Sequence, residues 1–567
     1  MIIADTIFVN GKVATVDKQF SFQRSVAVKD GWIIEVGQDS DVKKHIGSDT
    51  RVIDLGGKLL MPGAHDAHTH GVSWGTTLAS CNCGYPDVNT IDDLRAVLKA
   101  RVQDLRPGEW LRGEGLNQDA LEAVCGRRAT RLDVDDVTPD NPVIIQDCTG
   151  HAAFANGKAM ELAGITAQTP EPDGGAIGRL PNGEPDGMFY EAGGTCLVMS
   201  HVPLWTEEEL RTSILTTQRI LNENGYTSYT ESTVGPANDL RESGRAGSRA
   251  IYIYRQLQDE GKLTCRVALG FYSGKNGFQS AELLEQQLDS FDFQRFDNPD
   301  WLKMDMVKIF CDGVPMGHHA WMLKDYLDAP GNHGHSNLGP QGASDEEQEA
   351  ELHKMILIAH KHGYQLGIHA IGDRAVQACI DGFVKANQQY PGKHLRHYII
   401  HAEMFGSNAQ AKHAAHYHIG YSSQPGMGAY LTGDALYPSI GEHAYRSYQM
   451  KEIPDLGVMV VGGTDAICGP YPRWLDSVQY CVCRKSEITG QVTYPERAVS
   501  IEDAVRMFTI NAAYQENREE ITGSIEVGKA ADIQVLDSDI FTMEQDKIAQ
   551  ARVLLTMVGG RIVFERS

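Results

Sequence analysis

The sequence of 567 residues predicts an α/β fold, in which a (β/α)8 barrel of the TIM type carries an insertion and a composite β-sandwich domain. Two observations carry this prediction. Strand-like and helix-like segments alternate through the middle of the chain, over roughly 450 residues, as in parallel α/β folds. Short strands with Gly and Asp turns occupy the two ends instead. Because domain termini often lie close together, we expect both ends to form one domain.

Residues 1–60 are the predicted N-terminal part of the β-sandwich. They contain short apolar stretches between Gly and Asp turns, namely Ile7–Val9, Ser25–Val28, Trp32–Val36 and Val52–Leu55. Residues 523–567 have the same pattern, and Gly559-Gly560 is typical of a hairpin turn. The two ranges are therefore predicted to be the halves of one β-sandwich, with the barrel in residues 61–522.

Helix start and stop signals recur inside the barrel range. Thr206 and Glu209 form a capping box before a helix with apolar residues at helical spacing, and Gly225 ends it. Ser344 begins a second helix of this kind, and Gly363 closes it. A strand-like stretch follows each glycine. Repetition of this unit is typical of a parallel barrel.

An insertion is expected because residues 61–522 exceed the roughly 250 residues of a typical barrel. The best candidate lies at roughly 75–200, a range rich in Gly, Pro and Asp that includes the turn-rich stretch 170–175. Long segments between barrel strands and helices are typical of lids over a pocket. The insertion is therefore predicted to cover a site for a small molecule.

Charge and composition exclude several classes of partner. The formal net charge of −24 argues against nucleic acid and against anionic membrane surfaces. The chain has no apolar run of about 18 residues that would span a membrane, and its first residues lack the pattern of a signal peptide. Its 11 cysteines are an odd and scattered set, which favours reduced thiols. We therefore expect a cytoplasmic protein with a small-molecule partner, and a homodimer stays open.

The most informative local motif is the His-x-His of His68 and His70, which follows the apolar run Leu59–Met61. Residues two apart on a strand point to the same face, so both imidazoles can reach one metal ion. A Pro-Gly pair and a later glycine bracket the stretch. A bare His-x-His is weak evidence for a metal, and its weight comes from residues further along the chain.

Metal-competent side chains also occur in four later strand-like stretches. They are Lys308, His369, His401 and Asp465. Taken singly, each has an ordinary explanation, because an aspartate before a helix is usually a cap and a lysine among apolar residues usually extends to solvent. In a barrel, however, the C-terminal ends of the strands converge on one pocket. Taken together in this order, the residues predict a metal centre.

With these residues in this order, the chain resembles the amidohydrolase superfamily of metal-dependent hydrolases, and most of all its subgroup known as amidohydrolase family 3. The resemblance covers essentially the whole chain. The matching stretches are 60–70, 150–156, 162–166, 187–191, 307–313, 369–375, 401–403, 424–425, 463–465 and 523–532. The resemblance is specific for the superfamily and the subgroup, and it leaves the substrate open.

The resemblance implies one or two divalent metals per chain, and imidazole with carboxylate favours zinc. The implied ligands are His68, His70 and Asp465 for the more buried metal, and His369 and His401 for a second. Lys308 lies where the family has a lysine carboxylated by CO2, which bridges two metals. An ammonium has no lone pair to donate, whereas a carbamate offers two oxygens. Burial among apolar neighbours lowers a lysine pKa and exposes the neutral amine that reacts with CO2.

The implied reaction is hydrolysis of a C–N bond in a small amide-type molecule by a metal-bound hydroxide. Asp465 would take the proton of the water and deliver it to the leaving group. The subgroup favours an N-substituted amide. Two other activities of the same site stay open, namely ester or lactone hydrolysis and metal-assisted decarboxylation. A non-catalytic metal-binding protein is a further alternative, but the complete set of ligands argues against it.

Substrate contacts are expected from the insertion and from the segment after the lysine strand. The candidates are His151, His318, His319 and Trp321. His318 and His319 depart from the subgroup pattern, which has small or Arg-containing residues after the Asp-Gly pair. This departure leaves the identity of the substrate open.

Two further features are set apart from the metal motif. Glu231 lies in a strand-like stretch where a less acidic residue is expected. Cys81 and Cys83 follow the metal strand closely, and a structural role for these thiols outweighs metal ligation.

Overall fold

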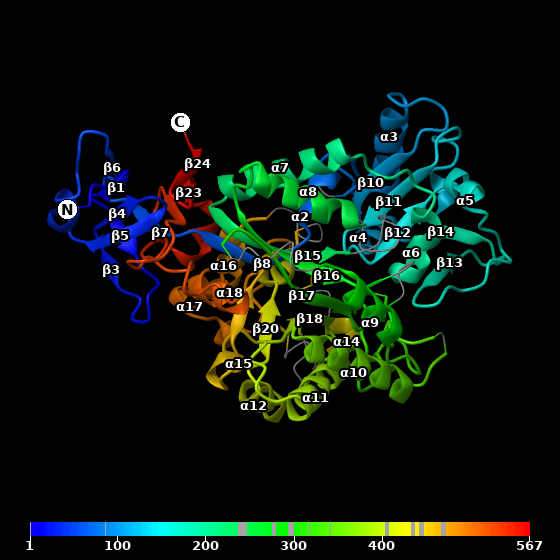
Figure 1. The fold of residues 1–567 in the computed structure, drawn as a ribbon. Coiled ribbons are helices and arrows are strands. Elements are labelled where there is room, and N and C mark those ends of the chain that lie inside the picture. The colour runs from blue at the N-terminus through cyan, green and yellow to red at the C-terminus, as the bar shows by residue number, and fades with distance from the viewer. Residues whose placement is uncertain are drawn as a thin grey trace.

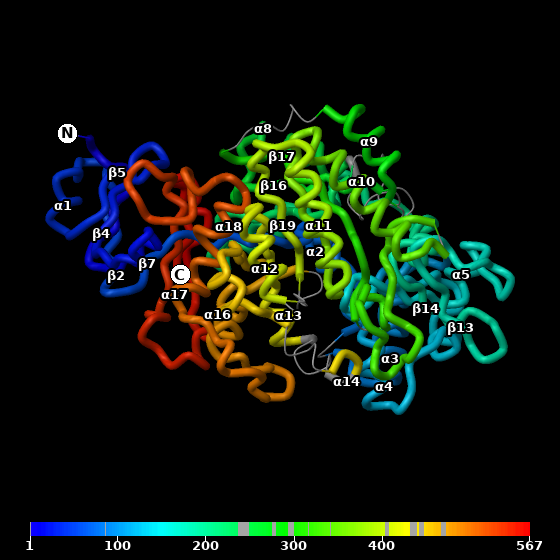
Figure 2. Tube along the Cα trace, turned by 90° about the horizontal axis from the view of Figure 1, so that it is seen from below, coloured from blue at the N-terminus to red at the C-terminus, as the bar shows by residue number. Residues whose placement is uncertain are grey.

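The computed structural model describes residues 2–84, 87–235, 247–274, 279–292, 300–315, 317–340, 342–402, 407–432, 437–441, 447–466 and 472–566. Figure 1 shows three parts in a row, with a small β domain at one end, a barrel in the middle and an α/β lobe at the other end. The blue N-terminal and red C-terminal segments lie side by side in the small domain (Figures 1 and 2). The predicted fold class is confirmed, whereas the boundaries 1–60, 61–522 and 523–567 stay a prediction.

Eight parallel strands form the barrel. In order around it they are β8 (Ala64–Thr69), β15 (Tyr226–Val234), β16 (Arg266–Tyr272), β17 (Leu302–Phe310), β18 (Gln365–Ala370), β19 (Tyr398–His401), β20 (Gly420–Ser423) and β21 (Val460–Gly462). Each strand pairs in parallel with its neighbour in this order. The first and last strands meet where the N–H of Asp465 donates to His68 O at 2.8 Å, so the sheet is nearly closed.

Helices cover the outside of the barrel and connect its strands (Figure 1). They include α2 (Gly71–Thr77), α7 (Glu207–Glu223), α8 (Gly247–Asp259), α9 (Ala281–Ser290), α10 (Asp345–His362), α11 (Asp373–Gln389), α12 (Asn408–His416), α15 (Glu452–Asp455), α16 (Trp474–Cys483), α17 (Ile501–Met507) and α18 (Ile510–Gln515). As predicted, Thr206 caps α7 and Ser344 caps α10. Gly363 ends α10 with a φ of 87°, which glycine adopts without strain. None of the described helices is both long and apolar enough to cross a membrane.

Strands from both ends of the chain build the small β domain. One sheet consists, in order, of β5 (Trp32–Gly37), β4 (Ser25–Lys29), β1 (Thr6–Val9) and β6 (Arg51–Asp54). The other consists of β24 (Arg561–Glu565), β23 (Val553–Val558), β22 (Ile533–Leu536), β7 (Leu59–Pro62), β2 (Lys12–Ala14) and β3 (Phe22–Gln23). Phe8 of the first sheet shares a buried core with Leu60 and Ile533 of the second. The predicted composite β-sandwich is thereby confirmed.

Gly63 joins the small domain to the barrel, because it lies between β7 and β8. A Cβ at this position would collide with the side chain of Thr227 in the neighbouring strand β15. The close passage of the two strands therefore requires glycine. This short link fixes where β8, the strand of the His-x-His motif, enters the barrel.

The lobe at the other end of the molecule is the expected insertion, and it lies between β8 and β15 in the sequence. Its sheet consists, in order, of β13 (Ala176–Arg179), β14 (Pro185–Tyr190), β12 (Ala152–Ala155), β11 (Val143–Asp147), β10 (Leu111–Leu116) and β9 (Cys81–Asn82). Leu94 of α3 (Ile91–Val102), Leu111 and Phe154 belong to a core of its own. Cys81 and Cys83 are buried in this lobe, which agrees with a structural role.

Candidate metal centre

The six predicted metal-site residues converge at the C-terminal ends of the barrel strands. Their positions are His68 in β8, His70 at the start of α2, Lys308 in β17, His369 in β18, His401 at the end of β19 and Asp465 just after β21. Parallel strands direct their C-terminal ends to one face of a barrel, where barrel enzymes have their active sites. The order of the strands therefore gathers residues that are far apart in the sequence.

Two histidines and a carboxylate form the tightest group. Asp465 Oδ1 lies 3.3 Å from His68 Nε2 and 3.2 Å from His70 Nε2. In the part of the chain that the structure describes, this is the one group of three His, Cys, Asp or Glu side chains whose ligand atoms all lie within 4.8 Å of one another. His68 Nε2 and Asp465 Oδ1 are buried, and among the described residues neither makes a hydrogen bond of good geometry outside this group. Buried donor atoms of this kind fit a divalent metal such as zinc.

His369 and His401 stand beside this group. Their ring centroids are 4.6 Å apart, and His401 Nε2 lies 4.0 Å from Asp465 Oδ2. Among the described residues His369 Nε2 has no hydrogen-bond partner, although it is buried, so it too fits a metal. Lys308 is fully buried, with Nζ 4.4 Å from the ring centroid of Phe310. The structure thus places all the predicted ligands around one centre, and their metal role stays a prediction.

Burial sets the protonation state of the histidines, and their contacts set that of Asp465. Burial, followed by the charge of Lys308, lowers the pKa of His68 to about 3. Burial is also the main reason why the pKa values of His369 and His401 lie well below the usual value. Burial alone would raise the pKa of Asp465, but its contacts with the histidines outweigh burial and lower that pKa. Neutral imidazoles and an ionised carboxylate are the forms that bind metals.

Two of the predicted ligands have unusual backbone conformations. The φ angle is 70° at His401 and 53° at Asp465, in the left-handed region that residues other than glycine rarely adopt. Such strain persists only where the surrounding structure imposes it, and it gathers at functional sites. Gly463 allows the close approach of the last strand to β8, since a Cβ there would lie 2.7 Å from His68 N.

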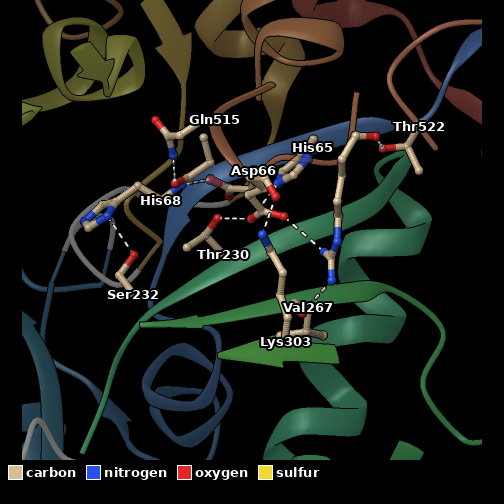
Figure 3. A network of polar contacts seen from close by, with 12 residues as sticks. His65, Asp66, His68, Thr230, Ser232, Val267, Lys303, Gln515 and Thr522 are labelled. Carbon is tan, nitrogen blue, oxygen red and sulfur yellow. Dashed lines mark hydrogen bonds and ion pairs between the residues drawn. The ribbon is translucent and has the colours of Figure 1, made fainter. Parts of the chain in front are cut away.

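Sequence reasoning missed the residues that orient His68. Ser232 Oγ lies 2.6 Å from His68 Nδ1, which leaves Nε2 for a metal (Figure 3). Asp66 accepts from His68 N at 3.2 Å and from Thr464 N at 2.9 Å, and thereby ties β8 to the segment that carries Asp465. Contacts of this kind fix the orientation of metal-binding rings. Ser232 is a polar residue inside a fully buried strand, and this is the signal by which it could have been found.

Asp312 was also missed, and it organises the loops around His369. Its carboxylate accepts from Ile371 N at 3.0 Å, Gly372 N at 2.9 Å and Trp321 N at 2.9 Å. Burial raises the pKa of this carboxyl to about 7. Because Asp312 follows β17 and the first two donors follow β18, one side chain fixes the ends of two neighbouring barrel strands.

Two of the four predicted substrate contacts line a pocket beside the predicted metal ligands. His151 and His319 share this pocket with Tyr190 and Arg128. The walls come from the insertion lobe and from the segment after β17. The ring centroid of His151 lies 5.1 Å from that of His369, so the pocket adjoins the candidate metal centre.

The other two predicted contacts lie elsewhere. His318 Nε2 is 2.9 Å from Asp328 Oδ1, and its side chain is partly exposed. Trp321 is fully buried, and its Nε1 donates to Asp345 Oδ1 at 3.0 Å. Neither residue is part of the lining of this pocket. Their contact with substrate stays a prediction that the pocket does not support.

Glu231, the unexpected acidic residue, anchors a helix. Its Oε2 accepts from Val72 N at 2.8 Å and from Tyr254 OH at 2.9 Å. It thereby holds the first turn of α2, directly after His70. Burial raises the pKa of the Glu231 carboxyl to about 7. The departure from the expected sequence pattern therefore has a structural reason.

Glu231→Gln is expected to become increasingly stabilising, relative to the wild type, as the pH rises. The folded pKa of about 7 lies above the unfolded value of about 4.3. Between these values the folded chain keeps the proton and the unfolded chain loses it, so the stability of the wild type falls with rising pH, by up to about 1.4 kcal/mol per pH unit. Glutamine keeps an acceptor oxygen and has no proton to lose. Urea unfolding of both proteins between about pH 5 and pH 8 measures the difference.

Glu207→Gln is the matched control, because it makes the same change at an exposed position of α7. The control should differ from the wild type by a small amount that does not vary over this pH range. If the difference between Glu231→Gln and the wild type were equally independent of pH, the raised pKa of Glu231 would be wrong.

Comparison with known proteins shows which family and which solved structures the chain is similar to. The model described as "Amidohydrolase family" matches residues 51–564. The N-substituted formamide deformylase of Arthrobacter pascens is 28% identical over 571 residues, which cover 99% of each chain. The protein LONG AFTER FAR-RED 3 of Arabidopsis thaliana is 28% identical over 572 residues, covering 99% of this chain and 92% of that protein.

A solved structure shares the fold. The crystal structure of an uncharacterized metal-dependent hydrolase from Pyrococcus horikoshii matches with a TM-score of 0.70. The match covers 95% of this chain and 99% of that one, at 22% sequence identity. The similarity thus extends over the barrel and also over the parts built onto it.

Proposed function

The chain belongs to the amidohydrolase family, and on this premise we propose that it is a metal-dependent hydrolase that cleaves a C–N bond in small amide-type molecules. The observation that carries the proposal is the group of His68, His70 and Asp465, whose ligand atoms lie together at the C-terminal face of the barrel. The relative from Arthrobacter pascens is named for a substituted formamide, and this supports an N-substituted amide as the substrate class.

The proposed metal sites use the residues that converge at the strand ends. The residues proposed to hold divalent metal, with zinc favoured, are His68, His70 and Asp465 for one ion and His369 and His401 for a second. Lys308 is proposed to be carboxylated, because an ammonium group has no lone pair for a metal and this side chain is fully buried beside the histidines. When bound, a divalent metal lowers the pKa of a water molecule and polarises a carbonyl group.

Asp465 holds and moves the proton in the proposed reaction. Its carboxylate takes a proton from the attacking water and gives it to the nitrogen of the departing amine. An amine leaves poorly as an anion, so this proton matters more for a C–N bond than for a C–O bond. His151 and His319 line the adjoining pocket, where they are proposed to contact the substrate.

Protein prepared without chelators is expected to contain about one or two divalent metal ions per chain, mainly zinc. Elemental analysis measures this content. The protein should hydrolyse members of a panel of N-formyl, N-acyl and cyclic amides, lose this activity on chelation and regain it when zinc is added. His70→Asn should lower the metal content, because it removes a proposed ligand. His413→Asn, at an exposed position of α12, is the matched control and should leave the metal content unchanged.

Three other results would contradict the proposed amide hydrolysis. Protein without a transition metal that stays inactive when metal is added would overturn the proposed enzyme. Turnover of esters or lactones alone would assign the site to C–O bonds. Release of CO2 from aromatic acids without any turnover of amides would assign it to decarboxylation.

A further inference from the structure

A buried carboxylate lies against His151 on the side of the insertion lobe. Glu191 begins α6 (Glu191–Met199) and is 3% exposed. Its Oε2 lies 2.9 Å from His151 Nδ1, and its backbone N–H donates to His151 O at 2.6 Å. The two residues are therefore held together through both side chain and main chain.

The backbone of Glu191 is strained. Its φ angle is 53°, in the same left-handed region as those of His401 and Asp465. A glutamate adopts this conformation only where the surrounding structure imposes it, and such strain gathers at sites of function. Glu191 shares this property with two of the proposed metal ligands, although it lies in the insertion lobe and they lie in the barrel.

The barrel leaves room for this carboxylate. Gly313 follows the strand of Lys308, and a Cβ on Gly313 would collide with Glu191 Oε1. The φ angle of Gly313 is not positive, so glycine is needed here for space and not for its conformational freedom. Asp312, the preceding residue, is fixed by three backbone N–H donors. A rigid part of the barrel thus meets the lobe at Glu191.

Burial of this carboxylate is costly, and the structure compensates for it with histidine. Taking an ionised carboxylate out of water requires a partner of opposite charge or hydrogen-bond donors. Burial would raise the pKa of Glu191, but His151, together with His319 and His335, outweighs burial and lowers it. A buried charge that stabilises the fold little by itself is often retained for function.

We infer that Glu191 is a positioning residue that fixes the ring of His151 at the wall of the substrate pocket, an inference that rests on the proposed function. The hydrogen bond to Glu191 engages Nδ1, so Nε2 is the ring nitrogen that remains for the substrate. The ring lies 5.1 Å from that of His369, centroid to centroid, so a substrate at the metal centre passes within reach of it. Glu191 is itself part of the pocket lining, and its proposed role is exercised through His151.

Glu191→Gln tests this inference with kinetics and metal analysis. Glutamine keeps an acceptor oxygen for Nδ1 but lacks the charge that holds the ring of His151, so kcat and kcat/KM should fall together, by about 10–100-fold, on an N-formyl or N-acyl amide that the wild type hydrolyses. The metal content should stay that of the wild type, because Glu191 is not a proposed ligand. Glu184→Gln is the matched control. It makes the same change just before β14, the strand that Glu191 follows, and the side chain of Glu184 is 49% exposed. The kinetics of this control should equal those of the wild type.

A double-mutant cycle distinguishes positioning from a general effect on stability. If Glu191 acts through His151, Glu191→Gln should cause no further loss in a His151→Gln background, because the ring that it positions is gone. Additive losses, wild-type kinetics of Glu191→Gln, or loss of metal from Glu191→Gln would each overturn the inference. If neither the wild type nor Glu184→Gln hydrolyses any amide, the proposed function fails first, and the inference fails with it.

Discussion

Asp465→Asn is expected to lower kcat for amide hydrolysis by about 10²–10⁴-fold, while the protein stays folded. Asparagine has the same size as aspartate, so the closure of the barrel between Asp465 N and His68 O should survive. The amide oxygen cannot take up the proton of the attacking water at neutral pH. The expected loss is therefore that of general acid–base catalysis, and it falls on kcat more than on KM.

The metal content of Asp465→Asn separates proton transfer from metal binding. Asparagine keeps one oxygen near His68 and His70, so we expect part of the metal to remain. Activity per bound metal ion should therefore be lower than in the wild type. Asp455→Asn is the matched control, because it changes an exposed carboxylate at the end of α15. This residue lies shortly before β21, the strand that Asp465 follows. Turnover of Asp465→Asn at the wild-type rate would show that another group moves the proton.

The barrel and the convergence of the candidate metal ligands were predictable from the sequence for physical reasons. Capping residues and glycines, such as Thr206 and Gly363, mark where helices begin and end locally. Apolar strands that end in a histidine or an aspartate place these side chains at one face, once the strands are parallel. The positions of His68 and Asp465 therefore follow from strand order. Their proposed roles came from the resemblance to a family.

The parts that were not predictable depend on contacts between distant segments. Ser232 meets His68 across 164 positions of the chain, and no local pattern indicates that pairing. The left-handed backbone at Asp465 likewise lies where the last strand meets the first. His319 and Trp321 are close in sequence, yet only His319 lines the pocket, since Trp321 is fully buried and its Nε1 donates to Asp345.

Glu516→Ala is expected to reduce the free energy of unfolding by about 3–5 kcal/mol, because it breaks a buried network of charges. Glu516 lies 2.9 Å from His65 Nε2 and 3.0 Å from Arg518 Nη1, and it accepts a hydrogen bond from Thr230. The side chain of Arg518 is 1% exposed, so alanine would remove the carboxylate that its guanidinium contacts inside the protein.

Glu519→Ala is the matched control for this network. Glu519 also pairs with an arginine, at 2.7 Å from Arg396 Nη2, but these two side chains are 22% and 23% exposed. Partly solvated pairs contribute about 0–1 kcal/mol, so the control should unfold at nearly the urea concentration of the wild type. Equal losses for Glu516→Ala and Glu519→Ala would show that burial does not set the strength of the network.

The loss caused by Glu516→Ala should also depend on pH. Burial alone would raise the pKa of Glu516, but His65 and Arg518 outweigh burial and lower it. A lowered folded pKa stabilises the protein above the unfolded value of about 4.3, and this stabilisation disappears as the pH falls toward the folded pKa. The difference in unfolding free energy between the wild type and Glu516→Ala should therefore be constant near neutral pH and shrink in acid. A difference that grew in acid would mean that the carboxyl of Glu516 is protonated in the folded protein. The charge of Arg518 would then be balanced by another carboxylate.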